Sequence, residues 1–166
     1  MFKTKLLILL LASLAIISCT KENIEIKSKK FSIAYISGGY DGLLLDNYLR
    51  SNLISLNKYD KNSIYEVKAN ISHGSNIYIT NIDNTSDRSK IDTELSITIR
   101  NLKEECETYS ENFHTTQFYI YSSAEKFLSN ETASKKIKKN NTENLVRKFI
   151  SKIDQVKINC NEDQSN

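Results

Sequence analysis

The sequence contains no proline and only four glycines among its 166 residues, so the turns that depend on proline are missing from it. Three of the four glycines stand close together in the segment SGGYDG, at positions 37–42. Their spacing matches no nucleotide-binding fingerprint, and a loop between a strand and a helix explains them more simply. The glycines therefore give no reason to expect a nucleotide site.

Histidine is equally scarce, with His73 in a predicted turn and His114 in a predicted strand. The chain carries neither the G-x-S-x-G motif of serine hydrolases nor the H-E-x-x-H motif of zinc proteases. Cys106 and His114 would lie roughly 27 Å apart along an extended strand, too far to share a metal ion. We therefore expect no catalytic site, no metal site and no cofactor.

The N-terminus resembles a bacterial export signal. Lys3 and Lys5 precede the apolar run 6–17, which as a helix is only about 18 Å long and falls short of the ~30 Å hydrocarbon core of a membrane. The run ends in Ile16-Ile17-Ser18-Cys19, which resembles a lipobox and predicts that Cys19 is lipidated and becomes the mature N-terminus. The alternative is an ordinary secretory signal with a chance cysteine. Thr20 follows the cysteine in place of Asp, so we expect a lipid-anchored protein of the outer membrane, facing the periplasm.

Cleavage at this point sets the domain organisation and the charge. Residues 1–18 are the predicted signal peptide, 19–30 a lipidated tether, 31–157 a single α+β domain and 158–166 a polar tail. The full chain has 23 basic and 20 acidic side chains, and loss of Lys3 and Lys5 leaves 21 against 20. A nearly neutral mature protein gives no electrostatic reason to bind nucleic acid.

The apolar periodicity predicts the order β-α-β-β-β-β-α. A helix with Asp41 as its N-cap follows strand 31–36, and the segment 72–76 closes a hairpin between strands 63–71 and 77–82. The run 91–100 has the cleanest alternation, strand 106–121 carries a possible bulge between Phe113 and Phe118, and a second amphipathic helix covers 131–154. The sequence thus predicts an α+β two-layer sandwich, in which a mostly antiparallel sheet of four to five strands is covered on one face by two helices.

Once Cys19 is lipidated, Cys106 and Cys160 remain. In an oxidising periplasm such a pair more often forms a disulfide than stays reduced, so we expect a bridge that encloses 53 residues. The alternative is two free thiols, because the distance between the two residues is not known from the sequence.

Two cations stand before the long alternating strand. Arg88 and Lys90 are two residues apart, so in an extended segment they project from the same face about 7 Å from each other. That spacing suits the oxygens of a phosphate cluster, which Arg can bind with its forked guanidinium group. The alternative is a solvated turn whose charge Asp87 and Asp92 neutralise.

Three segments resemble the family of the LPS-assembly lipoprotein LptE: LLLDNYLRSNL (43–53), TSDRSKIDTELSITIRNL (85–102) and YSSAEKFLSNETASKKIKKNNTENLVRKFISKI (121–153). The family's aromatic-rich stretch after the lipidated cysteine is missing, and a cysteine pair is not expected of it. The resemblance implies a plug and assembly factor for the β-barrel LptD that contacts lipopolysaccharide. It places the family's lipopolysaccharide-contacting arginine at Arg88, with Lys126 as the nearest candidate for a second cation. The alternative is a lipoprotein that scaffolds another envelope complex without binding lipid.

Overall fold

The computed structural model describes residues 29–79, 87–121, 127–156 and 160. The predicted signal peptide, Cys19, most of the tether, Lys126 and nearly all of the predicted tail lie outside these residues. No helix in the described part of the chain is long and apolar enough to cross a membrane.

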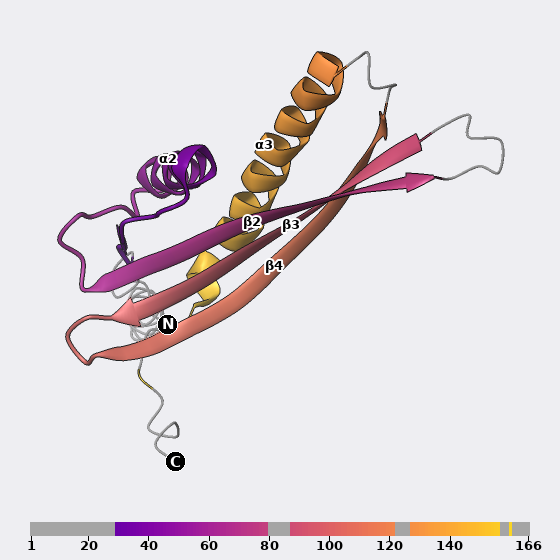
Figure 1. Ribbon diagram of the computed structural model, residues 1–166. Helices are drawn as coiled ribbons and strands as arrows, with labels where there is room; N and C mark the ends of the chain where they lie inside the picture. Colours follow the sequence, from indigo (N-terminus) through magenta and orange to yellow (C-terminus); the bar gives the residue numbers. More distant parts are fainter. Residues whose placement is uncertain (1–28, 80–86, 122–126, 157–159, 161–166) are drawn as a thin grey trace, which may run out of the picture.

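The described residues form one four-stranded sheet with two helices on the same side of it (Figure 1). The sheet order is β1-β2-β3-β4, in which β1 runs parallel to β2 and the other neighbours are antiparallel. The predicted α+β class with a mostly antiparallel sheet is therefore confirmed. The elements are β1 (Ser32–Ile33), α2 (Gly39–Ser55), β2 (Tyr65–Ile79), β3 (Asp87–Asn101), β4 (Cys106–Tyr121), α3 (Phe127–Lys152) and the 3₁₀-helix η2 (Ile153–Gln155).

The predicted hairpin at 72–76 is wrong, and so is the separate strand that was expected to follow it. Strand β2 runs without a break through Gly74, and it pairs continuously with β3 from Tyr65 opposite Asn101 to Ile79 opposite Asp87. Residues 72–76 have the polar composition of a turn, but their backbone N–H and C=O groups form the regular hydrogen bonds of a strand with β3. The order of elements is thus β-α-β-β-β-α.

The bulge in β4 also differs from the prediction. Ile99 pairs with Tyr109 whereas Arg100 pairs with Glu107, so the extra residue is Thr108. Phe113 and Phe118 differ in parity because they lie on opposite faces of a regular strand. Phe113 is 6% exposed and Phe118 is 56% exposed.

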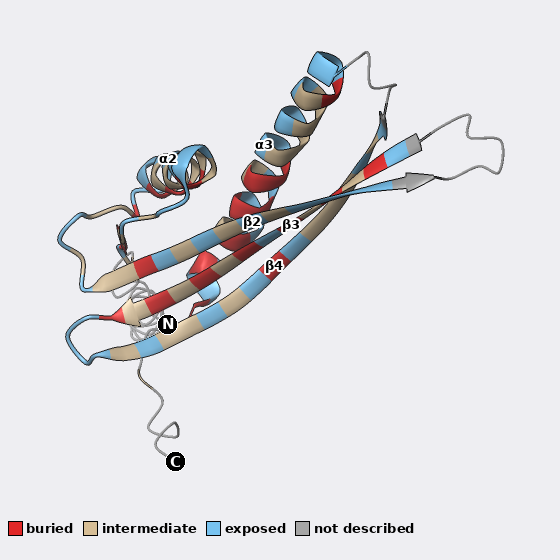
Figure 2. Ribbon diagram, viewed as in Figure 1, coloured by how far each residue is buried: buried red, intermediate tan, exposed pale blue. Residues whose placement is uncertain are grey.

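The core lies between the helices and one face of the sheet. Leucines at helical spacing in α2 pack against α3 and β2, and the buried C-terminal half of α3 covers β3 and β4 (Figure 2). We call this side the helix face of the sheet, and the opposite side the uncovered face. The buried apolar side chains of the cluster are Phe31, Leu45, Leu49, Leu53, Val67, Leu95, Ile97, Ile99, Phe113, Leu145, Val146, Phe149, Ile153 and Val156.

Helix α2 begins at Gly39, after Gly38 with φ of +115°. Asp41 is therefore a residue of the first turn, not the N-cap as predicted, and no side chain caps this helix end. Gly42 is buried, and a Cβ atom there would lie 2.2 Å from the carbonyl oxygen of Ser37. The glycine thus allows the loop to pack directly against the first turn of the helix.

The chain enters and leaves the described fold at one end, where β2 begins and β3 ends. Lys29 Nζ donates a hydrogen bond of 2.6 Å to the Val156 carbonyl, and a disulfide joins Cys106 to Cys160 with 6.0 Å between their Cα atoms. We call this the proximal end. The other end, where β2 ends and β3 begins, is the distal end, and the candidate site lies there.

Candidate functional site

The two cations singled out in the sequence lie on one face of β3 near its distal end. The helix-face residues of this strand are the buried ones, Ser89, Ile91 and their alternate successors, so Arg88 and Lys90 project from the uncovered face. Both residues belong to the paired strand, which begins at Asp87, rather than to a turn. The strand ladder therefore fixes the direction in which their side chains leave the sheet.

Lys90 is already paired. Its Nζ atom lies 2.8 Å from Asp92 Oδ2, and Thr116 donates a hydrogen bond of 2.6 Å to the other carboxylate oxygen. His114 Nε2 lies 3.9 Å from Asp92 Oδ1, the oxygen that accepts the hydrogen bond from Thr116. The hydrogen bond from Lys90, followed by that from Thr116, holds the pKa of Asp92 below its usual value. Much of the charge on Lys90 is thus balanced within the sheet.

Arg88 differs from Lys90 in this respect. Its side chain is exposed, and among the described residues it forms no ion pair. A guanidinium group in this position presents its donors to solvent and can bind a phosphate or carboxylate in a forked arrangement. Arg88 is therefore the stronger candidate of the two for an anionic ligand.

Apolar side chains flank the two cations on the same face. In the register between β3 and β4, Ile120 lies opposite Arg88 and Phe118 lies opposite Lys90. Ile120 is 72% exposed and Phe118 is 56% exposed. The distal uncovered face therefore places cations beside exposed apolar surface, an arrangement that suits an amphiphile with an anionic head group and hydrocarbon chains. We call these four residues the amphipathic patch.

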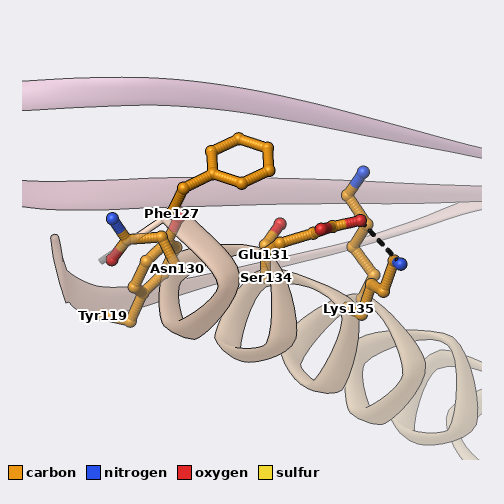
Figure 3. A pocket seen from close by; sticks show the side chains of 7 residues that line it. Tyr119, Phe127, Asn130, Glu131, Ser134 and Lys135 are labelled. Carbon is orange, nitrogen blue, oxygen red and sulfur yellow. Dashed lines mark ion pairs between the residues drawn. The ribbon is translucent and has the colours of Figure 1, made fainter. Parts of the chain in front are cut away.

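A cavity of about 320 Å³ lies on the helix face, at the start of α3 (Figure 3). The cavity and the amphipathic patch lie on opposite faces of the sheet, because Tyr119 in the cavity wall pairs with Ser89, which is buried on the helix face. A 2.7 Å ion pair between Glu131 and Lys135 lies at its rim, and the hydrogen bond from Lys135 to Glu131 raises the pKa of the lysine. The lining residues are Tyr119, Phe127, Asn130, Glu131, Ser134, Lys135 and Lys138.

Most of the lysines of α3 are exposed, as on the polar side of an amphipathic helix. Lys138 is the exception, since it is half-buried and lines this cavity. The sequence holds one signal for this position: Lys138 lies one helical turn before Asn141 and Thr142, whose side chains are buried on the same helix. Lys126, the other predicted contact, lies outside the described residues.

One group in the described chain has the composition of a metal site. Ligand atoms of Glu104, Cys106 and Cys160 lie within 4.8 Å of one another at the proximal end. The two sulfur atoms are joined in the disulfide, so neither is available as a thiolate ligand. This group therefore stabilises the fold covalently rather than through a metal.

Neither a family model nor a curated protein matches the sequence. Solved structures do share its fold. A minor lipoprotein of Acinetobacter baumannii superposes with a TM-score of 0.57 at 14% identity, over 76% of this chain and 91% of the other. The rare lipoprotein B of Shewanella oneidensis gives 0.51 at 9% identity over 76% and 96%, and lipoprotein B of Nitrosomonas europaea gives 0.56 at 12% over 75% and 81%. At these identities the likeness establishes the fold alone.

Proposed function

We propose that this chain is an outer-membrane lipoprotein of the LptE kind, anchored through Cys19. In this role it acts with a large β-barrel of the LptD kind as plug and assembly factor, and it contacts lipopolysaccharide on its way to the outer leaflet. The observation that carries the proposal is the amphipathic patch. Lipid A combines phosphate groups with acyl chains, and the patch offers Arg88 for the former beside Phe118 and Ile120 for the latter.

The position of the patch relative to the anchor supports this role. The chain enters the fold beside β1, whose Ser32 pairs with Glu66, and Glu66 in turn pairs with Arg100 of β3. Arg88 precedes Arg100 by twelve residues on the same strand, so the two residues lie about 40 Å apart at the usual rise per residue. A domain tethered at its proximal end can therefore hold its cations well away from the lipid anchor, inside a surrounding barrel.

The uncovered face supports the plug role in a second way. Along most of its length this face is polar, and one row of charged residues, Glu66, Arg100 and Glu107, alternates in sign from β2 to β3 to β4. Such a surface suits contact with the hydrated interior wall of a large barrel. The similar folds of three bacterial lipoproteins are consistent with a lipid anchor at Cys19.

Replacing Arg88 by alanine is expected to weaken binding to lipopolysaccharide by roughly tenfold or more, because a charge-assisted hydrogen bond contributes about 1.5–3 kcal/mol. Lys90→Ala should have a smaller effect, since Asp92 already balances that cation. Binding to lipopolysaccharide aggregates would be measured by titration calorimetry at low and high salt. Thermal unfolding of each variant should stay close to that of the unmodified protein, because both side chains lie outside the core.

Arg100→Ala is the matched control. Arg100 is the same residue type on the same face of the same strand, but it lies at the proximal end opposite Glu66 and Glu107. Its replacement should leave the affinity unchanged. Equal affinity of the Arg88 and Arg100 variants would remove the patch from the binding site.

The partner is tested separately, by purification of the tagged, lipidated protein from detergent-solubilised outer membranes. We expect one large β-barrel protein to co-purify in a one-to-one ratio. Recovery without a barrel, together with no measurable lipopolysaccharide binding by the unmodified protein, would favour a scaffold for another envelope complex that binds no lipid.

A further inference from the structure

The contact between α3 and the sheet changes character along the helix. Its C-terminal half is held by apolar side chains, among them Leu145, Val146 and Phe149, which belong to the main core cluster. The longer N-terminal portion, residues 127–142 and called the N-terminal half below, buries the polar side chains of Asn130, Asn141 and Thr142, and Asn141 donates a hydrogen bond to Thr93 of β3. Ile91 is buried in the same region but is not part of the main cluster. The two halves of α3 are therefore attached by different chemistry.

A hydrogen-bonded cluster joins the polar half of α3 to two strands. The Thr93 hydroxyl oxygen lies 2.9 Å from His73 Nδ1 of β2 and accepts a hydrogen bond of 3.0 Å from Asn141 Nδ2 of α3. Thr93 and Asn141 are both fully buried. Because the hydroxyl accepts from Asn141, its own hydrogen is available to His73 Nδ1, but only while that nitrogen carries no proton. The cluster is thus complete when His73 is neutral.

The cluster is less stabilised than the apolar core. His73 Nε2 and Asn141 Oδ1 are buried, and neither has a hydrogen-bond partner among the described residues. Separation of α3 from the sheet at this point would hydrate both atoms, whereas separation at Phe149 would expose apolar surface. The N-terminal half of α3 is therefore the part that opens more easily.

Three elements bear on the charge of His73. Burial is the largest influence and lowers its pKa from the ordinary value of 6.5. Asp41 of α2 opposes this shift and Lys138 of α3 adds to it, while β3 presents the uncharged hydroxyl of Thr93. Since the pKa is lower in the closed contact than in an open one, the closed contact binds fewer protons. Its stability is fully present above about pH 6.5 and is lost as the pH falls towards and through the lowered value.

We propose that His73, Thr93 and Asn141 form an acid-sensitive latch, which holds the N-terminal half of α3 on the distal half of the sheet and releases it when His73 is protonated. Protonation leaves the Thr93 hydroxyl hydrogen without its acceptor, even though the hydroxyl oxygen can then accept from Nδ1–H, and it places a cation in a half-buried site near Lys138. Release exposes the helix face of the distal strands, including Ile91 and the wall of the cavity at Tyr119. The latch concerns the fold itself and does not depend on the ligand or the barrel proposed above.

Hydrogen exchange measured by mass spectrometry tests this latch at about pH 7.5 and about pH 5.5, after correction for the intrinsic exchange rate. A group that titrates at 6.5 when open and at a lower pH when closed raises the opening constant between these conditions, by at most about tenfold. We expect residues 130–141 to lose protection against hydrogen exchange at the lower pH, while residues 145–152 keep theirs. His73→Gln retains an acceptor for Thr93 but does not titrate, so in this variant the change should disappear.

His114→Gln is the matched control, because it removes the other histidine, which is exposed on the uncovered face. It should keep the loss of protection at the lower pH. The same change in the His73 and His114 variants, or equal loss of protection in both halves of α3, would overturn the latch.

The proposal stays testable if the His73 variant does not fold. In the His114→Gln protein the only imidazole signal is that of His73, and its titration can be followed by NMR. The midpoint of that titration should coincide with the loss of protection in residues 130–141. Protection that persists after His73 has titrated would also overturn the proposal.

Discussion

Replacing Cys106 and Cys160 together by serine is expected to lower the free energy of unfolding by about 4 kcal/mol. The disulfide closes a chain segment with a sequence separation of 54 residues, and on the chain-entropy model a loop of this length restricts the unfolded chain by that amount. The bridge also fastens Cys160 to the start of β4, and Val156, four residues earlier in the chain, is 3% exposed in the core. Loss of the bridge therefore affects both the unfolded chain and the proximal edge of the core.

Thermal unfolding of a soluble form, in which Cys19 is replaced by alanine, measures this effect. A loss of this size should lower the Tm by roughly 10–20 °C for a domain of this length. Reductant should lower the Tm of the protein with both cysteines but leave the serine variant unchanged, which makes the variant its own control. Full alkylation of both thiols in the folded, unreduced protein would show that no bridge forms.

The features that the sequence predicted correctly are those encoded within one element. The alternation of Ile91, Leu95 and Ile97 places these side chains on one face of a strand whatever its neighbours are, and all three are buried. The leucines at positions 45, 49 and 53 form one stripe of a helix for the same reason. Arg88 and Lys90 share a face because a strand has a period of two.

The errors concern features that depend on a partner strand. Residues 72–76 have the composition of a turn, and only the complementary ladder of β3 keeps them extended. The bulge at Thr108 likewise depends on how β4 is aligned with β3 near Arg100. Backbone pairing over long sequence distances decides both features, and local propensity does not contain it.

The candidate site was predictable in the same partial way. Sequence reasoning found Arg88 and Lys90 and raised the alternative that Asp92 neutralises them, and the ion pair between Lys90 and Asp92 bears this out for one of the two cations. It did not find Phe118 and Ile120 beside them, because that requires the register between β3 and β4. The cluster of His73, Thr93 and Asn141 joins three elements, so it too was beyond reach of the sequence.

Phe149→Ala is expected to cost about 3–5 kcal/mol of stability, the usual range when a buried aromatic side chain is removed from a core. Phe149 is fully buried, and its ring lies 6.2 Å from that of Tyr109 and 6.3 Å from that of Phe113, in an edge-to-face arrangement with the latter. These contacts attach the apolar half of α3 to β4, so their loss leaves a cavity at the joint between helix and sheet.

Phe127→Ala provides the comparison on the same helix. Phe127 is 65% exposed at the distal end, and its replacement should change the stability by no more than about 0.5 kcal/mol. Chemical denaturation of both variants, with hydrogen exchange along α3, measures the difference. Similar costs for the two would mean that α3 is held evenly along its length. A large cost for Phe149 alone would establish the C-terminal half as the fixed part of the helix, which is the condition under which its N-terminal half can separate from the sheet while the fold persists.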